Sequence, residues 1–286
     1  MVPMTTTTTH STIDAPVLVI GANGKTGRRV AERLTARGVP VRAVSRSTTP
    51  AFDWFDETTW AAALAGARVA YVTVQPDLGM PGSTELVTAF GAAAAAHGLE
   101  HLVLLSGRGE PVAQECEQIL LGSGVATTVI RCSFFAQNFS EHFLVDAVNQ
   151  GVIALPAGDV REPVVDADDI ADVAVAALTE DGHAGQLYEL TGPRMLTFAE
   201  ATAEIGKALD REIAFVDVSP AEYVAGLAAE GVPDDVTELL MYLFTTVLDG
   251  RNSSLGDGVQ RALGREPRDF YDYAWDTARQ GTWDRA

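Results

Sequence analysis

A glycine-rich segment directly after an apolar run is the feature that most restricts the fold of this chain. Val17–Ile20 is a run of valine, leucine and isoleucine, and Gly21, Gly24 and Gly27 follow it with two residues between successive glycines. Glycines at this spacing permit a tight turn and let backbone N–H groups approach a diphosphate, which the start of the next helix also attracts. The sequence therefore predicts a strand, a phosphate-binding loop and a helix over residues 17–37.

The same alternation of strand and helix signals continues to about residue 150. Short apolar runs rich in β-branched residues predict strands, and the amphipathic or alanine-rich stretches between them predict helices. The expected strands are residues 17–20, 41–45, 69–74, 102–105 and 127–130. The expected helices are residues 25–37, 58–65, 83–96, 111–121 and 136–149. This order is typical of a parallel sheet with helices on both faces.

Helix signals dominate after Gly151. Helix-capping or helix-starting residues occur at Asp166 with Asp169, at Thr197 with Glu200, at Ser219 with Glu222 and at Pro233, and short strands are expected at residues 186–190 and 213–216. We therefore predict an α/β, Rossmann-type fold with a doubly wound parallel sheet and a smaller, helix-rich C-terminal lobe. The expected division is a disordered tail (1–13), an NAD(P)-binding domain (14–155) and an interleaved substrate lobe (156–286).

Composition narrows the possible partners. The net charge of −19 opposes binding to nucleic acid, and no apolar run approaches the roughly 20 residues that cross a bilayer. Cys116 and Cys132 are too few for a disulfide framework and wrongly spaced for zinc, which favours a cytoplasmic location. His101, His142 and His183 lack metal-ligand spacing, so no metal is expected. We expect a small-molecule substrate, and the sequence does not predict an oligomeric state.

The end of the second expected strand indicates which dinucleotide binds. NAD enzymes usually carry an acidic residue about 20 residues beyond the glycine loop to hold the ribose hydroxyls. This chain has Arg46 between two serines instead, and an arginine can bind the 2′-phosphate of NADP with two hydrogen bonds. Lys25 and Arg28 either add to that pocket or are ordinary solvent-exposed cations. The predicted cofactor is NADPH/NADP⁺.

Several motifs together resemble one protein family. The glycine loop is followed by RAVSRS, AFDWFDETTW, LVLLSG, VIRCSFFAQNF, VVDADDIA and YELTGPRMLT, over nearly the whole chain after the tail. These motifs resemble the NmrA-like atypical short-chain dehydrogenases/reductases. More narrowly, they resemble the group that includes the ergot-alkaloid reductases (agroclavine and festuclavine synthases) and their bacterial relatives.

The loop and this resemblance together imply a set of site residues. The implied cofactor contacts are Gly21, Asn23, Gly24, Lys25, Thr26, Gly27, Arg46, Asp53, Trp54, Val74, Gln75, Pro76, Ser106 and Gly107. The implied substrate pocket consists of Arg108, Cys132, Phe134, Phe135, Asn138, Met241 and Phe244. Met241, Tyr242 and Phe244 lie on an expected helix that resembles the family's substrate lid. For these residues, and for Phe134 and Phe135, a place in the core is an equal explanation. For Cys132 a buried, inert thiol is the alternative.

The usual catalytic pair of short-chain dehydrogenases is missing. Those enzymes reduce ketones with a Tyr-x-x-x-Lys pair, but this chain has neither tyrosine nor lysine between Ser106 and Val125. The segment instead contains Arg108, Glu110, Glu115 and Glu117, and Ala113 stands where phenylcoumaran-type relatives carry a lysine. Tyr71 and Tyr223 are the remaining candidate phenols.

A reductase without that pair needs an acceptor that takes hydride easily. We therefore predict an NADPH-dependent oxidoreductase of secondary metabolism that reduces an imine, an iminium or a conjugated C=C bond. Two alternatives stay open. One is a redox-sensing, NmrA-like regulator without turnover, and the other is a pathway enzyme that keeps the cofactor as a scaffold for a non-redox cyclisation.

Overall fold

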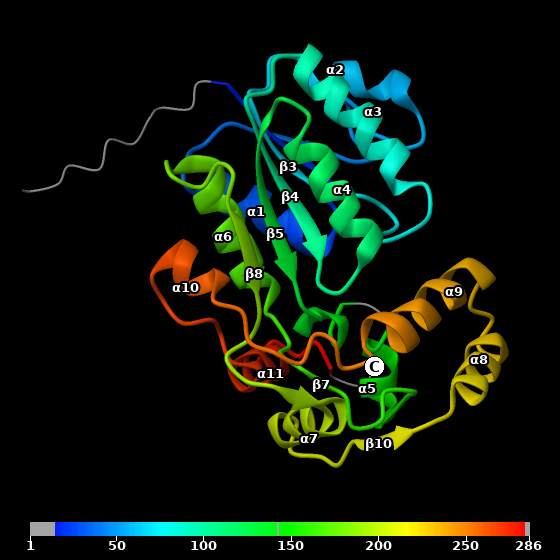
Figure 1. Cartoon of the computed structure of the whole chain (residues 1–286). Coiled ribbons are helices and arrows are strands. Elements are labelled where there is room, and N and C mark those ends of the chain that lie inside the picture. Colours follow the sequence, from blue (N-terminus) through cyan, green and yellow to red (C-terminus); the bar gives the residue numbers. More distant parts are fainter. Residues whose placement is uncertain (1–14, 142, 284–286) are drawn as a thin grey trace, which may run out of the picture.

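The computed structural model describes residues 15–141 and 143–283, so the predicted tail and His142 lie outside the described residues (Figure 1). Its larger lobe is built on one six-stranded parallel sheet with the strand order β2-β1-β3-β4-β5-β8. The strands are β1 (Val17–Ile20), β2 (Val41–Val44), β3 (Val69–Val72), β4 (His101–Gly107), β5 (Ala126–Cys132) and β8 (Leu187–Leu190). The order reverses between β1 and β3, which opens a crevice at the carboxyl ends of the strands. The predicted doubly wound α/β fold is confirmed.

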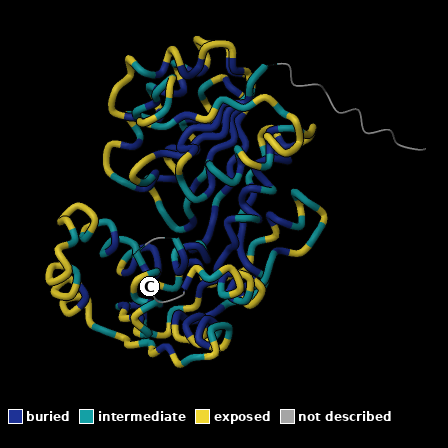
Figure 2. The backbone as a smooth tube through the Cα atoms, turned by 180° about the vertical axis from the view of Figure 1, so that it is seen from behind, coloured by how far each residue is buried: buried dark blue, intermediate teal, exposed yellow. Residues whose placement is uncertain are grey.

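Helices cover both faces of the sheet because side chains of β1 alternate between them. Val17 and Val19 pack with buried residues of α1 (Lys25–Ala36) and α6 (Ala167–Thr179). Leu18 and Ile20 point to the opposite face and pack with the other helices. Those helices are α2 (Trp60–Leu64, after the 3₁₀-helix η1 at Glu57–Thr59), α3 (Ser83–Ala96) and α4 (Pro111–Leu121). The strands consequently form the buried centre of this lobe, as Figure 2 shows.

A second lobe follows β5 and has a core of its own, with fully or nearly fully buried Phe139, Phe198, Phe244, Phe270 and Trp283. Its strands are β6 (Val152–Leu155) beside β10 (Ala214–Asp217), and β7 (Arg161–Glu162) beside β9 (Leu196–Thr197). Its helices are α5 (Val145–Gln150), α7 (Phe198–Ala208), α8 (Pro220–Ala229), α9 (Asp234–Tyr242), the π-helix η3 (Leu243–Val247) and α11 (Phe270–Arg279).

The chain passes from the sheet lobe to the second lobe and back, so the lobes are not consecutive segments. Although α6 and β8 follow residue 155, they complete the sheet lobe, and α10 (Gly258–Leu263) packs on both of them. The division at residue 155 therefore stays a prediction. Within residues 15–141 and 143–283, no helix is long and apolar enough to pass through a bilayer.

The single helix expected over residues 136–149 is wrong. Residues 136–138 form the short 3₁₀-helix η2 (Ala136–Asn138), and a helix begins again only with α5. The backbone between them faces inward, because the carbonyl of Phe139 accepts a hydrogen bond from the indole of Trp283 at 2.8 Å. The hydroxyl of Ser140 likewise accepts one from Tyr273 at 2.8 Å. Tyr273 of α11 and Trp283 beyond it thus anchor the segment that follows η2.

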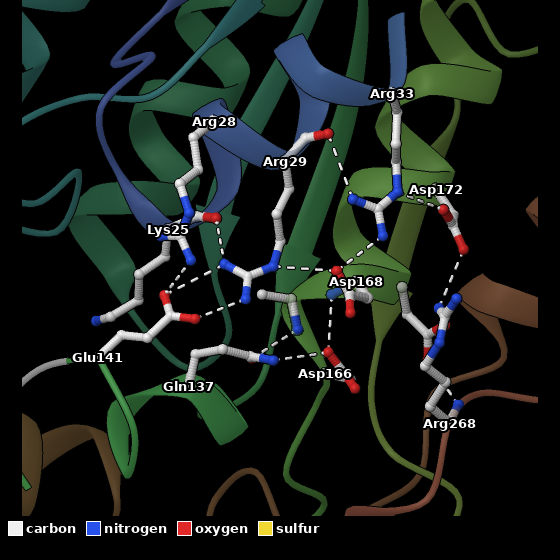
Figure 3. A network of polar contacts seen from close by, with 12 residues as sticks. Lys25, Arg28, Arg29, Arg33, Gln137, Glu141, Asp166, Asp168, Asp172 and Arg268 are labelled. Carbon is white, nitrogen blue, oxygen red and sulfur yellow. Dashed lines mark hydrogen bonds and ion pairs between the residues drawn. The ribbon is translucent and has the colours of Figure 1, made fainter. Parts of the chain in front are cut away.

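A network of ion pairs connects α1 with α6 and with the segment between η2 and α5 (Figure 3). Arg29 pairs with Asp168 at 3.0 Å and with Glu141 at 2.6 Å, and Arg33 pairs with Asp172 at 2.8 Å. Burial alone would raise the pKa of each of these carboxyls, but hydrogen bonds and attraction from the arginines outweigh it and lower the pKa of all three. The network therefore holds α1, and the glycine loop before it, in one place.

Candidate active site

The glycine loop has the geometry of an anion-binding turn. Gly21 has a φ of +77°, and a Cβ at Gly27 would collide with the carbonyl oxygen of Gly21. Helix α1 begins behind Gly24 without any side-chain cap, so the N–H groups of residues 25–27 have no acceptor within the helix. First-turn amides without an intrahelical acceptor and the positive end of a helix together fit the diphosphate of a dinucleotide.

Arg46 is an unpaired cation beside that loop. The amide of Asn23 connects the loop to the end of β2 through the hydroxyl of Ser45 at 3.0 Å. Among the described residues, Arg46 is the only arginine without a hydrogen bond or ion pair, and it is exposed. By contrast, Lys25 donates to Asn138 at 2.7 Å and Arg28 pairs with Glu141 at 2.8 Å. Those two cations are thus committed to residues that follow β5.

Trp54, expected on the adenine side, lies in the core. It is only 4% exposed, packs against Phe52, Trp60 and Phe90, and donates its indole N–H to the carbonyl of Thr73 at 2.9 Å. The density of aromatic residues in this segment is the signal that would have indicated a core cluster. Asp53 is half-buried and accepts a hydrogen bond from the amide of Phe55, whose ring is 73% exposed.

A cavity of about 340 Å³ lies at the carboxyl ends of the strands, between the two lobes. The strand-end residues that line it include ten of the expected site residues: Lys25, Val74, Pro76, Ser106, Gly107, Arg108, Cys132, Phe134, Phe135 and Asn138. The second lobe contributes α9 and η3 to the opposite wall. The cavity therefore connects the expected nicotinamide end of the cofactor groove with a wall of the second lobe.

Of the three residues on the helix that resembles the family's lid, Tyr242 lines the cavity, whereas Met241 and Phe244 do not. Phe244 is 3% exposed and packs against Phe198 and Tyr223 in the core of the second lobe, and neither it nor Met241 lines the cavity. Tyr242 and Leu243 line the cavity instead. The helix changes from α to π at Leu243, so an α-helical period does not apply to the residues from Leu243 onwards. The α-helical periodicity of the sequence does not predict this change to a π-helix.

Two carboxyl groups, those of Asp77 and Glu110, lie in the cavity wall. Sequence analysis noted Glu110 in the segment that lacks the tyrosine–lysine pair, but it missed Asp77. Asp77 accepts a hydrogen bond from the backbone of Gly79 at 2.7 Å and another from the carboxyl of Glu110. Burial raises the pKa of both groups, and the neighbouring negative charge of Asp77 helps to raise that of Glu110 to about 8. Glu110 is therefore a protonated acid at neutral pH.

Glu162 is a third carboxyl group in the cavity wall, and sequence analysis missed it. It is 1% exposed, and neither of its carboxylate oxygens has a hydrogen-bond partner in the described chain. Burial raises its pKa to about 7, an effect that the charge of Arg108 partly opposes. Its place on the two-residue strand β7 gives a weak sequence signal, which explains why it was missed.

Other expected groups are present but committed or inaccessible. The hydroxyl of Ser106 donates to the buried Glu117 at 2.6 Å, and Glu117 pairs with Arg131. Burial raises the pKa of the Cys132 thiol and of the Tyr71 phenol. Tyr223 is held in the aromatic core, and its pKa is raised to about 12 by burial. The phenol that lines the cavity is therefore Tyr242.

Comparisons with known proteins identify relatives of this chain. No family model matches the chain. Prestalk A differentiation protein A of Dictyostelium discoideum is 29% identical over 280 residues, which cover 91% of this chain and 92% of that protein. Agroclavine dehydrogenase of Claviceps fusiformis is 30% identical over 283 residues, which cover 91% of this chain and 96% of the relative.

A solved structure shares the fold. The triphenylmethane reductase of Citrobacter sp., complexed with NADP(H), superposes with a TM-score of 0.78 at 20% sequence identity. The match covers 92% of this chain and 99% of that one. At this level of identity, the likeness establishes the common architecture of both lobes.

Proposed function

The chain belongs to the atypical short-chain dehydrogenase/reductase family, with the ergot-alkaloid reductases among its relatives, and on that premise we propose that it is an NADPH-dependent reductase. Its acceptor is an iminium or imine, or a conjugated C=C bond, in a small secondary-metabolite-like substrate. The observation that carries the proposal is the cavity of about 340 Å³ between the strand ends and α9 with η3. We further propose that residues 156–286 supply the substrate side of this cavity.

The described residues fit NADPH at one end of the crevice. The amides of residues 25–27 and the open turn at Gly21 would hold the diphosphate, and the unpaired Arg46 would hold the 2′-phosphate. Ser106 and Gly107 would border the nicotinamide end. When bound, NADPH supplies the hydride for the reduction.

The protein's own contribution is to position and enclose the acceptor. The apolar walls, from Phe134 and Leu240 among others, exclude water from the acceptor. An iminium becomes a neutral amine on accepting hydride, so this reaction requires no proton from the enzyme. That chemistry suits a cavity without a tyrosine–lysine pair.

A conjugated C=C bond is the second candidate acceptor, and the Asp77–Glu110 pair favours it specifically. Such an acceptor needs a proton as well as hydride, and Glu110 holds a transferable proton in the cavity wall at neutral pH. The neighbouring Asp77 helps to raise the pKa of Glu110. Glu110 would thus donate the proton that the tyrosine of a tyrosine–lysine pair donates in other short-chain dehydrogenases.

Turnover with a panel of acceptors tests the proposal. The purified protein is mixed with NADPH and with a cyclic iminium, a conjugated cyclic ketone or a saturated cyclic ketone, and the loss of NADPH absorbance is measured. We expect turnover with the iminium or the conjugated ketone and none with the saturated ketone. Glu110→Gln should lower kcat for the conjugated ketone by about 100-fold, within the range for general acids, and leave the iminium rate unchanged.

Each alternative function predicts a different result. A redox sensor binds NADPH and NADP⁺ tightly but oxidises no NADPH with any acceptor. An enzyme that uses the cofactor as a scaffold converts substrate while NADPH absorbance stays constant. Reduction of only the saturated ketone would contradict the proposed acceptor class.

A further inference from the structure

We propose that Glu162 is a specificity-determining residue that binds a cationic nitrogen of the substrate. The inference rests on the proposed function, because it places this nitrogen in the same cavity. It narrows the substrate class to small, largely apolar molecules that carry a positive charge on nitrogen, either an iminium or an ammonium group.

The first observation is that the buried carboxyl group of Glu162 has no hydrogen-bond partner in the described chain. Glu117 and Asp169 are both 0% exposed, and each is paired with arginine. Glu162 is 1% exposed, yet neither oxygen accepts a hydrogen bond. A buried charge without partners costs several kcal/mol, so proteins rarely retain one unless a ligand completes it.

The second observation is that the fold aims Glu162 into the cavity. Glu162 forms an antiparallel pair with Leu196 in the short β7–β9 ladder, which fixes its backbone. Neighbouring side chains on a strand point to opposite sides. Arg161 accordingly pairs with Glu200 at the surface, at 3.2 Å, while Glu162 lines the cavity.

The third observation is that the nearest cation is already committed. The guanidinium of Arg108 donates to the carbonyls of Asn252 at 3.2 Å and Ser254 at 3.0 Å, and also to the hydroxyl of Ser254. Arg108 reduces the electrostatic cost of Glu162 but forms no ion pair with it within the described residues. A ligand cation is therefore the missing partner.

The remaining cavity wall suits the rest of such a molecule. Phe134, Leu240 and Leu248 give it apolar surfaces, and aromatic rings also attract cations. The carboxyl groups of Asp77 and Glu110 add polar surface to the same cavity. A neutral molecule of the same shape would fill the apolar part but leave Glu162 unpaired.

Binding of two isosteric probes tests the inference without turnover. The protein saturated with NADP⁺ is titrated calorimetrically with N,N-dimethyltetrahydroisoquinolinium, which is permanently charged, and with the dimethyltetralin of the same shape. We expect the wild-type protein to bind the cation about tenfold or more tightly than the hydrocarbon, as one favourable charge contact would give. Glu162→Gln, nearly equal in size, should remove this preference.

The control is Glu238→Gln, which removes an exposed carboxylate from α9 and should keep the full preference. Glu162→Asp keeps the charge and should give an intermediate preference. Equal affinity of the wild-type protein for both probes would overturn the inference, and so would a preference that survives in Glu162→Gln. The wild-type comparison holds even if the Gln variant does not fold.

The experiment separates this inference from the proposed function. NADP⁺ cannot donate hydride, so a selective but inactive protein would contradict only the proposed reductase activity. A protein that reduces acceptors but does not prefer the charged probe would contradict only the role of Glu162.

Discussion

Two groups of acidic residues in this chain are partly or fully buried, but their pKa values shift in opposite directions. Between α1 and α6, arginines lower the pKa of Glu141, Asp168 and Asp172. In the cavity wall, burial raises the pKa of Glu110 to about 8 and of Glu162 to about 7. The difference lies in the partners, because each member of the first group has at least one arginine in direct contact and neither of these two has any.

The comparison separates structural charge from functional charge. The first group joins secondary-structure elements, and each ionised carboxylate is balanced within the protein. The carboxyl groups of the second group have no arginine partner, and they line the cavity in which we propose that the substrate binds. Perturbed pKa values gather at functional sites for this reason.

The largest effect is expected at Asp169, a fully buried carboxylate of α6 that lies beside the structural group. Asp169 is 0% exposed and accepts hydrogen bonds from the backbone and guanidinium of Arg268, and it also pairs with Arg265 at 2.7 Å. Asp169→Ala should lower the free energy of unfolding by about 3–5 kcal/mol, because it removes the fully buried carboxylate that pairs with both arginines. Urea denaturation measures this. Asp249→Ala, at an exposed pair, is the control and should leave the midpoint unchanged.

Replacing Glu162 should raise the stability of the protein above pH 7, whereas replacing Asp169 should lower it. Its pKa is about 7 in the folded protein, against a usual value of 4.5, so the folded form retains a proton that the unfolded chain has released. Stability therefore falls as the pH rises from about 4.5 to about 7, by about 3 kcal/mol in all. Glu162→Gln should remove this loss and be more stable than the wild type above pH 7. Parallel pH profiles for both proteins would contradict an unpaired carboxylate.

Arg46 is the cationic counterpart of Glu162, a charge without a partner. Arg46→Ala should weaken NADPH binding about tenfold or more and leave NADH binding nearly unchanged, since only NADPH carries the 2′-phosphate. Fluorescence titration with both cofactors measures this. Arg68→Ala removes an exposed arginine that is already paired with Glu100, and it should change neither affinity. Equal losses for both cofactors in Arg46→Ala would refute the 2′-phosphate assignment.

The smallest effect is expected at the exposed edge of the structural group. Asp168 pairs with Arg29 and Arg33, but its side chain is 39% exposed, so water screens the charges. Asp168→Asn should cost about 1 kcal/mol or less in unfolding free energy. A loss as large as that of Asp169→Ala would show that burial does not set the strength of these pairs.

The sheet lobe was largely predictable from sequence because its signals are local. Each strand and the helix that follows it have their own pattern of apolar residues, and the glycines of the loop predict the turn that follows β1. The ends of the strands were less exact, as β4 and β5 extend to Gly107 and Cys132. The pairing partner decides where a strand ends, and that partner is distant in sequence.

The site was predictable only where it follows strand ends. Ser106, Gly107 and Phe134 line the cavity as expected, since parallel strands bring their carboxyl ends together. Glu162 and Leu243 were missed because their positions depend on how the second lobe folds back. A buried, unpaired acid has no sequence signature, since partners are supplied by tertiary contacts.

The crossing of the chain between lobes limits how this protein can be divided. β8 pairs with β5 from Val129 to Cys132, and α6 covers the face of the sheet beside α1. A fragment that stopped at residue 155 would therefore present an open sheet edge and a bare apolar face, both of which promote aggregation. Gene fusions or truncations that seek a minimal nucleotide-binding module should accordingly retain the chain at least through β8.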